Sequence, residues 1–548
     1  MADNAQELQF RELLDAMKEL QTVIESLRKE LAAKTKELQD QQEKYAREKK
    51  ATDEQIEYLM KKLYGKSSEK HDFNSDGQLS FFDEAEAEAP KATEPELDPE
   101  EETPVTVRKR KPKTVKEQLL KDIHVEEVLI TLPTEERICA VCGSEMISAG
   151  RKFVRDEWHF IPARLEVKRY YQETYFCPEC KKNGDKSNLI NAPVPEALIP
   201  HSMASETVVA HAMYQKYANA VPFYRQEKDW KQQGAVLNRA RLAKWTITCS
   251  EQYFTPVYDY FRRQMLKRSF LMADETRIQV LDEPERKPTT DSFMWLFRTG
   301  EDGLPPIILY GYTETRAKRN AVSFLDGFSG YLMTDGYQGY NDLPGITRTC
   351  CWAHVRRYFN DAVPQKKKMD YSDPALQGVI YCDKLFAVER HCSEHGFSAK
   401  QRYNYRLQHS KPLIDAFWKW VDIQKERQDA NSMIGRAITY ALNRKPYLAT
   451  YLEDGRCSFS NNASENSIRP FCVGRRNWLF NETPAGATAS ATVYTMVEMA
   501  KAHGLNVESY LTFLLKNRPH QGMSDEEFEN LAPWSKAARE FCGDSVAE

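Results

Sequence analysis

Two neighbouring acids stand inside a run of residues that otherwise predicts a buried β-strand. The run is SFLMADETRIQVL, residues 269–281, and it contains Asp274 and Glu275. An ionised carboxylate that loses its water is costly unless a cation pairs with it or it holds a metal. The sequence therefore predicts that Asp274 meets a compensating charge supplied by distant residues.

Further runs after this strand predict the elements that would position it. Strands are expected at DSFMWLFRTG, at PIILYGYTE, at GYLMTDGYQGY with a turn, and at ITRTCCWAH, with a helix at AKRNAVSFLDGF before the fourth strand. Three strands, helix, strand, helix, strand is the order of a ribonuclease-H-like α/β core. In that order the centre of the first strand lies beside the end of the fourth, so Asp274 and Asp335 are expected to face each other.

A third acid comes from NNASENSIRP, residues 461–470. Asn462 or Ser464 can cap a helix there, which puts Glu465 in the first turn and Arg469 one turn further on. Carboxylates from two adjacent strands and a nearby helix form the open, oxygen-rich site used for in-line phosphoryl transfer. Mg²⁺ in such a site would offset the desolvation of the strand acid.

Basic residues close to these acids in the sequence predict phosphate contacts. Arg356 and Arg357 follow the fifth strand, and Arg475 and Arg476 follow the third acid. His354 has two interpretations. It is either a contact to metal or phosphate from the end of the fifth strand, or a core histidine with satisfied hydrogen bonds.

Two Cys-x-x-Cys turns, CAVC and CPEC, predict a structural zinc site. The four predicted ligands are Cys139, Cys142, Cys177 and Cys180. Each turn offers two thiolates for tetrahedral Zn²⁺, and the runs KFVRDEWHFIP and RLEVKRYYQETYF between them alternate like the arms of a β-hairpin. Two redox or core cysteine pairs are the alternative.

A helical stretch is expected from about residue 204 to 265. Within it, YRQEKDWKQQG and AVLNRARLAKW predict two helices separated by a turn at Gly234, with Asn238 as the N-cap of the second. The next two turns carry Arg239, Arg241 and Lys244. This spacing suits a helix-turn-helix whose second helix enters a major groove, and a plain helical bundle is the alternative.

The N-terminal residues predict a coiled coil. Apolar residues recur every seven positions in two seams. One seam contains Phe10, Met17, Ile24, Leu31, Leu38 and Tyr45, and the other contains Leu13, Leu20 and Leu27. Lys34 and Gln41 interrupt the second seam. The pattern favours a self-associating helix, and an amphipathic helix packed on its own body is the alternative.

The charge is distributed unevenly along the chain. The net charge of −4 combines −9 in the acidic, proline-containing segment 83–104 with +5 in the rest. That segment cannot bury enough apolar surface to order itself, so it is expected to be a linker. The cluster RKRKPK, residues 108–113, is either a phosphate contact or a solvated basic face.

The bulk composition is that of a multidomain globular protein. At about 150 residues per domain, 548 residues suffice for three or four domains. No apolar run approaches the ~20 residues of a membrane helix, and MADNAQELQF has no signal-peptide core, so a cytoplasmic protein is expected. The 12 cysteines are then reduced, metal-bound or in the core, and Cys350, Cys351 and Cys472 are expected to be core or surface thiols.

The blocks ADET, TDGYQGYN, CWAHVRR and NNASENSIRPF resemble the acidic signature blocks of the insertion sequence 66 family of bacterial transposases. LYGKSSEK, the paired Cys-x-x-Cys turns and the leading coiled coil are similar to the N-terminal half of that family, so the resemblance spans nearly the whole chain. It implies Asp274, Asp335 and Glu465 as the acidic triad of a ribonuclease-H-like fold interrupted by a helical insertion. The 129 residues between Asp335 and Glu465 accommodate such an insertion, at about 363–455.

The insertion mixes basic residues with aromatic ones. The basic residues are KKK at 366–368, Arg402, Arg406, Arg444 and Lys445. Such a mixture can follow a DNA backbone and stack an unpaired base. Phe417 and Trp420, in contrast, are expected in the core.

With the resemblance included, the predicted function is that of a DDE-type DNA transposase in the bacterial cytoplasm, associated with the nucleoid. The triad would hold two Mg²⁺ ions, for which Mn²⁺ can substitute, and would direct water or a DNA 3′-hydroxyl at a phosphodiester. The alternatives are a metal-dependent nuclease that cuts without joining, a catalytically silent DNA-binding regulator, and a coiled-coil scaffold with incidental zinc. The expected partners are double-stranded DNA at element ends and target, further copies of the chain in a dimer or larger assembly, and small accessory proteins of the same element, with no membrane.

The predicted fold class is multidomain α+β, with a zinc-ribbon-like β module and a ribonuclease-H-like α/β core. The expected segments are a coiled-coil helix (1–70), an acidic then basic linker (71–115), the zinc-binding β module (116–200), a helical DNA-binding region (201–266), the first part of the core (267–362), the helical insertion (363–455), the last part of the core with the Glu465 helix (456–504) and a C-terminal helical tail (505–548).

Overall fold

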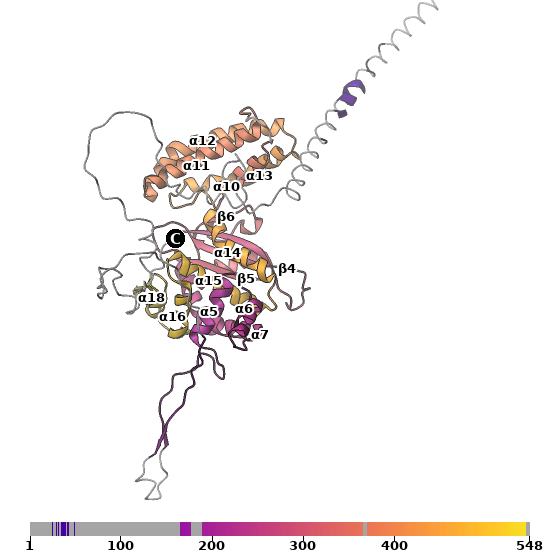
Figure 1. Cartoon of the computed structure of the whole chain (residues 1–548). Helices are drawn as coiled ribbons and strands as arrows, with labels where there is room; N and C mark the ends of the chain where they lie inside the picture. Colours follow the sequence, from indigo (N-terminus) through magenta and orange to yellow (C-terminus); the bar gives the residue numbers. More distant parts are fainter. Residues whose placement is uncertain are drawn as a thin grey trace, which may run out of the picture. The chain divides into compact units, whose positions relative to one another are not determined.

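The computed structural model describes residues 165–176, 189–364 and 370–543, together with scattered helical positions between 25 and 49. The chain divides into two compact units, Met1–Glu88 with Gln172–Glu548, and Ala89–Tyr171. In the second unit only 165–171 is described, and it forms no regular element. All elements named from here on belong to the first unit (Figure 1).

Several predicted features lie outside the described residues. These are most of the coiled coil, the acidic and basic linker, the four predicted zinc ligands and the KKK run of the insertion. Beside the zinc module, the predicted hairpin arm RLEVKRYYQETYF is a strand only at its end, β1 (Thr174–Phe176). It pairs antiparallel with β2 (Leu189–Asn191), which follows the second cysteine turn. The strand predicted in this arm was therefore too long for its described part, and the sequence did not identify β2 as the partner of β1.

The predicted helical stretch is confirmed as four α-helices. They are α5 (Glu206–Tyr217), α6 (Phe223–Gln232), α7 (Arg239–Cys249) and α8 (Thr255–Leu266), and a π-helical turn, η2 (Ser250–Phe254), joins the last two. Gly234 has a φ of +84° in the turn between α6 and α7, a conformation that suits glycine. Asn238 caps α7 as predicted, because its side chain accepts the backbone N–H of Arg241 at 2.9 Å.

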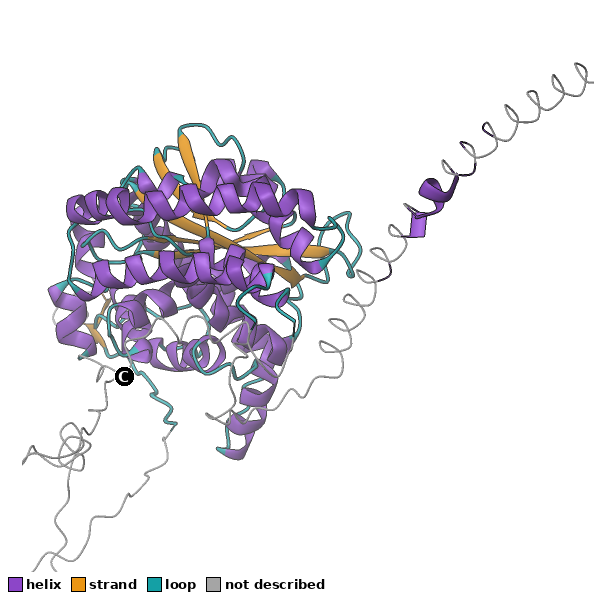
Figure 2. Ribbon diagram, turned by 90° about the horizontal axis from the view of Figure 1, so that it is seen from above, coloured by secondary structure: helices purple, strands orange, loops and turns teal. Residues whose placement is uncertain are grey.

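Five strands form one mixed sheet in the order β5-β4-β3-β6-β7. Figure 2 shows strands in orange among the purple helices. Their bounds are β3 (Phe270–Gln279), β4 (Asp291–Thr299), β5 (Ile308–Thr313), β6 (Gly330–Thr334) and β7 (Ile346–Cys350). The first three strands are antiparallel neighbours, whereas β6 runs parallel to β3 and β7 parallel to β6. The predicted neighbourhood of the first and fourth strands is confirmed.

The connections differ from the expectation in two places. Helix α9 (Lys318–Phe324) precedes β6 as predicted, but β6 and β7 are joined by a 3₁₀ turn, η3 (Gln338–Tyr340), rather than a helix. The fifth strand also ends at Cys350, and helix α10 (Trp352–Asp361) begins immediately afterwards. The run ITRTCCWAH was predicted as strand throughout because its apolar residues give no sign of where a buried strand changes to a buried helix.

Strand β3 sends alternate side chains to the two faces of the sheet. Leu271 and Ala273 belong to a large core that includes α8 and α15, whereas Phe270 and Met272 belong to a second core that includes α10 and the insertion helices. Asp274 therefore lies on the face of Met272, and Glu275 lies on the opposite face. The two acids of this strand need two different compensating environments.

Three helices fill the segment between α10 and the Glu465 helix. They are α11 (Pro374–Glu394), α12 (Ala399–Arg427) and α13 (Met433–Leu448), followed by a 3₁₀ turn, η4 (Thr450–Leu452). They lie side by side in Figure 1. Phe417 and Trp420 are 0% and 8% exposed, which confirms their predicted place in the core.

Arg406 was grouped with residues that could follow DNA, and this prediction is wrong. Its side chain is completely buried, and its five N–H groups donate two bonds to Glu389 and three to the carbonyls of Tyr451, Asp454 and Cys457. The sequence could not show this because the partners lie 17 to 51 residues away.

The chain continues from the Glu465 helix as a helical layer. The elements are α14 (Asn462–Trp478), α15 (Pro484–Ala502), α16 (Val507–Asn517), α17 (Asp525–Leu531) and α18 (Lys536–Cys542). Helix α15 packs on β5, where the backbone N–H of Tyr310 donates to Thr495. None of the helices in the described part of the chain has the length and apolarity needed to span a bilayer.

Candidate active site

The register of the central strands places Asp274 and Asp335 at the same level. Met272 of β3 pairs in parallel with Met333 of β6, and each acid follows its methionine by two residues. Because the side-chain period of a strand is two, Asp274 points to the same face as Met272. Asp335 follows the last residue of β6, next to Asp274 at this edge of the sheet. The sequence predicted that the first and fourth strands, β3 and β6, are neighbours, and their observed parallel pairing is the arrangement that this prediction required.

Helix α14 is fastened to the face of the sheet that carries Asp274. Arg298, which pairs with Met272, donates to the carbonyl of Ala463 and to Ser467 Oγ at 2.8 Å each. The hydroxyl of Tyr310 on β5 donates to the carbonyl of Ser467. These bonds use two polar side chains of one sheet face to fix the first turns of the helix.

Asn461, not Asn462 or Ser464, is the N-cap residue of α14. Its side chain makes no capping bond. Instead its Nδ2 donates to the carbonyl of Ala273, directly before Asp274, at 3.2 Å. The cap residue therefore ties the start of the helix to the strand, and Glu465 lies in the first turn as predicted. The choice among neighbouring polar residues depends on this long-range contact, which the sequence does not contain.

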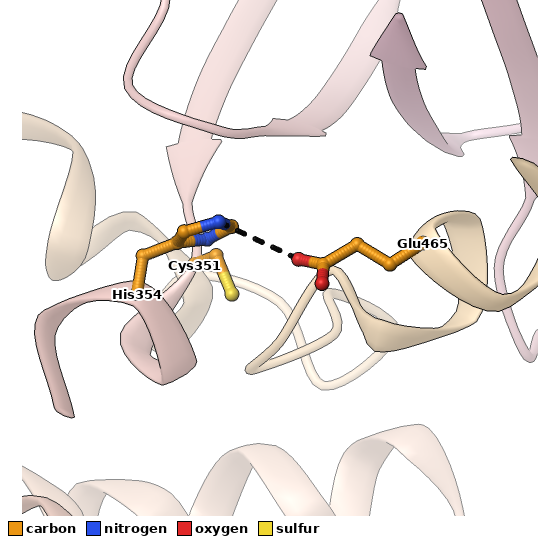
Figure 3. A group of neighbouring side chains, drawn as sticks. All are labelled: Cys351, His354 and Glu465. Atoms are coloured by element: carbon orange, nitrogen blue, oxygen red, sulfur yellow. Dashed lines mark ion pairs between the residues drawn. The ribbon is translucent and has the colours of Figure 1, made fainter. Parts of the chain in front are cut away.

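Helix α10 places two basic side chains beside Glu465, and Figure 3 shows one of them, His354. His354 Nε2 lies 3.5 Å from Glu465 Oε1, and Arg357 Nη2 lies 3.7 Å from Glu465 Oε2. His354 was expected at the end of the fifth strand but lies in the first turn of α10. It nevertheless lies beside one of the three predicted acids.

Electrostatics join the three acids into one site. Burial raises the pKa of Asp274 well above its ordinary value, and the charges of Glu275, Glu465 and Asp335 raise it further. A hydrogen bond from the backbone N–H of Glu275 at 2.8 Å opposes these effects without cancelling them. Asp274 is therefore the acid that both of the others influence.

Glu275, to which the sequence pattern assigned no role, also has a buried side chain. Its side chain is 1% exposed, forms an ion pair with Arg316 and accepts the hydroxyl of Tyr340. Burial and the charge of Asp335 still give it a raised pKa. The sequence did indicate that Glu275 needs its own partner, because two adjacent acids on opposite faces of a strand require two compensating groups. Nothing in the sequence identified Arg316 as that partner.

The loop that carries Asp335 is held from several sides. Asp335 Oδ1 accepts the backbone N–H of Tyr337 at 2.8 Å, and Arg316 Nη2 lies 3.7 Å from Oδ2. Arg348 of β7 donates to the carbonyl of Asp335 at 2.6 Å, and Arg444 of α13 donates to the carbonyl of Gly336 at 2.9 Å. A Cβ at Gly336 would lie 2.4 Å from the Arg444 guanidinium, so a larger residue there would displace the Arg444 side chain.

Among the described residues, one trio of potential metal ligands has its ligand atoms within 4.8 Å of one another, namely Cys351, His354 and Glu465. Burial, with the charge of Glu465, raises the pKa of the Cys351 thiol, and its Sγ accepts the N–H of Asn461 at 3.1 Å. Cys351 is therefore a buried thiol that packs between two elements, as predicted, rather than a thiolate ligand.

The carboxylates have the donor set that Mg²⁺ prefers. Glu465 Oε1 is buried and accepts no hydrogen bond, although buried carboxylate oxygens nearly always have a partner. The oxygens of Asp274, Asp335 and Glu465 do not form a group as tight as 4.8 Å. Ligands on opposite sides of one Mg²⁺ are only about 4.2 Å apart. With these side-chain conformations the three acids therefore do not all reach one Mg²⁺ ion.

The other predicted basic residues have different surroundings. Arg239, Arg241 and Lys244 on α7 are exposed, as is Arg476 on α14. Arg475 donates to Thr276 Oγ1 at 3.2 Å, which places its guanidinium close to Asp274 along β3. Arg469 is half-buried on α14, and Arg356 pairs with Asp383 at 2.6 Å.

The fold and this site define a mixed α/β protein with acids gathered at the edge of its central strands. Comparison with known families is more specific. The family model described as "Transposase IS66 family" matches residues 201–489, which is more than half of the chain, so the chain belongs to the IS66 family of transposases. Two further models match the N-terminal part: "zinc-finger binding domain of transposase IS66" at 136–181 and "Transposase C of IS166 homeodomain" at 51–128.

Similar proteins occur in Sinorhizobium fredii. "Uncharacterized protein y4jD" is 28% identical over 425 residues, which cover 75% of this chain and 80% of the relative. "Uncharacterized protein y4hP" is 27% identical over 432 residues, which cover 75% of each chain. The family resemblance inferred from the sequence blocks is thereby confirmed.

Proposed function

We propose that this chain is a DDE-type transposase whose core is ribonuclease-H-like and which cleaves DNA at element ends and joins the 3′-hydroxyl ends to target DNA. The observation that carries the proposal is that the charges of Asp335, at the end of β6, and Glu465, in the first turn of α14, both raise the pKa of Asp274 on β3. The strand order, with the acid-bearing strand in the centre, supports it.

The three acids would hold two Mg²⁺ ions. When bound, the metal would activate water or a 3′-hydroxyl and stabilise the leaving oxygen during in-line displacement. The raised pKa of Asp274 fits this role, because a buried acid repelled by two others gains most from a divalent cation. Mn²⁺, which also prefers oxygen ligands, would substitute.

Residues around the acids would position the reacting phosphate. Arg357 and His354 lie beside Glu465, where each can donate to a phosphate oxygen that approaches this acid. Arg316 lies between Glu275 and Asp335 and is 36% exposed, so it offers a second cation on the other side of the site. Fixed donors of this kind act on charge that develops in the transition state.

The remaining modules would bind DNA and assemble the complex. Arg239, Arg241 and Lys244 are exposed on α7, the second helix of a helix-turn-helix-like pair, and would contact the DNA backbone. Cys139, Cys142, Cys177 and Cys180 would bind one structural Zn²⁺ within the zinc-finger match. The N-terminal heptads would join copies of the chain into a dimer or larger assembly on two DNA ends.

A joining assay tests the proposal. Purified protein is mixed with Mg²⁺, a target plasmid and a pre-cut duplex that carries a terminal 3′-hydroxyl from the flanks of the protein's own coding segment. Joined product supports a transposase, nicks alone support a nuclease, and retention of DNA without either product supports a regulator. Asp274→Asn is expected to abolish both products and retain DNA binding. Joining by this variant would refute the assignment of Asp274.

A further inference from the structure

The C-terminal end of α14, the helix that carries Glu465, is followed by two exposed apolar side chains in a strained turn. Leu479 is 65% exposed and Phe480 is 43% exposed, and we call this pair the apolar tip. The N–H of Phe480 donates to the carbonyl of Trp478 at 2.8 Å, and Leu479 has φ 66° and ψ −49°. This is a classic-type γ-turn, which is rare and strained for a residue with a side chain.

The fold gains little from the Leu479 side chain in return for this strain. An exposed leucine buries little surface, and glycine would adopt the same φ at lower cost. The backbone after the turn is fixed, because Asn481 donates to the carbonyl of Gln279 at 2.9 Å and accepts the N–H of Leu281 at 3.0 Å. The tip is therefore held out rigidly from the end of β3, and strain of this kind is found where a side chain has a task outside the fold.

The surroundings of the tip are basic on the side of the helix. Arg476 is exposed three residues before Leu479, and Lys216 Nζ lies 5.3 Å from the Trp478 ring. On α14 the spacing of Glu465, Arg469 and Arg476 puts these three residues on one face, so the basic stripe leads from the candidate active site to the tip. Two exposed acids lie beyond Phe480, Glu482 and Asp282, and the backbone N–H of Asp282 donates to the carbonyl of Glu482 at 2.8 Å.

We propose that the apolar tip inserts into the base stack of bound DNA and unstacks one step of the duplex. Leucine and phenylalanine wedges flanked by basic residues are the chemistry that DNA-kinking proteins use for this purpose. Leu479 follows Glu465 by 14 residues, which corresponds to roughly 20 Å along the helix. At 3.4 Å per base pair, the unstacked step lies about six base pairs from the scissile phosphate. The inference rests on the proposed function, because it requires DNA along α14.

A mismatch preference tests the tip directly. The probes are two short duplexes of one sequence, fully paired or with a central mismatch next to 2-aminopurine. A mismatched step costs less to unstack, so wild-type protein is expected to bind the mismatched duplex about tenfold tighter and to raise its 2-aminopurine fluorescence. The variant Leu479→Gly/Phe480→Ala is expected to lose the preference and the fluorescence rise while it binds the paired duplex as the wild type does. Leu304→Ala, which truncates a 57% exposed leucine between β4 and β5, is the matched control.

Two outcomes would overturn the proposal. The first is a double variant that keeps the mismatch preference while wild-type protein joins DNA, which refutes the tip and leaves the proposed function intact. The second is a lower melting temperature for Leu479→Gly without DNA, since it would show that another part of the chain packs on the tip. A wild-type protein that gives no joined or nicked product refutes the proposed function separately, because the fluorescence experiment requires binding alone.

Discussion

Arg406 offers the sharpest test of how the insertion supports the candidate active site. Its buried guanidinium joins α12 to Glu389 of α11 and to three carbonyls in the segment that leads into Asn461 and α14. Arg406→Met keeps an apolar stem of similar length but leaves a nearly buried carboxylate and three carbonyls without donors. The chain thereby loses five hydrogen bonds that join these elements.

The magnitude follows from the burial of the pair. Breaking a buried ion pair by removing one partner costs about 3–5 kcal/mol, much more than a surface pair. The matched control is Lys411→Met on the same helix, which removes a pair to Asp415 between side chains that are 55% and 56% exposed. That change is expected to cost less than about 0.5 kcal/mol.

Urea unfolding followed by tryptophan fluorescence measures both values, because Trp352, Trp418 and Trp420 belong to the core that contains α12. The double variant Arg406→Met/Glu389→Leu is expected to recover part of the loss, since it removes the stranded carboxylate but leaves the carbonyls unpaired. If Arg406→Met were no more destabilised than Lys411→Met, the structural reading of this side chain would be refuted.

Three further predictions concern the site and the zinc module. Without divalent metal at neutral pH, Asp274→Asn is expected to melt above the wild type. The raised pKa of Asp274 means that its ionised form destabilises the folded state. This loss of stability is absent below the usual aspartate pKa of about 4 and grows as pH rises through the folded-state pKa. Scanning fluorimetry should therefore show that the difference in melting temperature between variant and wild type shrinks on acidification. Arg444→Ala frees the loop at Gly336 and is expected to slow joining up to about 100-fold at little cost in melting temperature, as single-turnover assays would show. Atomic absorption should find one zinc per chain in the wild type and none in Cys139→Ser/Cys177→Ser; zinc retained by that variant would refute the ligand assignment.

The sequence predicted those parts of the fold that depend on local pattern. The order of the strand and helix runs predicted that β3 and β6 are neighbours, and Asn238 was recognised as a cap from its place before a basic helix. Glu465 was placed in the first turn of a helix because residues that can cap a helix come just before it in the sequence. The strands and the helix starts are set within a few residues along the chain, whereas the pairing of β3 with β6 followed from the order of the elements.

Features that depend on distant partners were missed. The pairing of Glu275 with Arg316 spans 41 residues, and the bond from Asn461 to the carbonyl of Ala273 spans 188. The end of β7 at Cys350 was missed because a buried strand and a buried helix have similar composition. The turn at Leu479 gave no signal at all, since only its φ distinguishes it from an ordinary helix end.

The central claim is that Asp274, Asp335 and Glu465 bind divalent metal together. Mn²⁺ binding, followed by electron paramagnetic resonance of the free ion, measures this without DNA or turnover. We expect two sites per chain in the wild type and the loss of at least one in each of Asp274→Asn, Asp335→Asn and Glu465→Gln. The largest loss is expected for Asp274→Asn, because that acid is buried and the charges of both other acids act on it. Unchanged Mn²⁺ stoichiometry and affinity in all three variants would contradict the central claim.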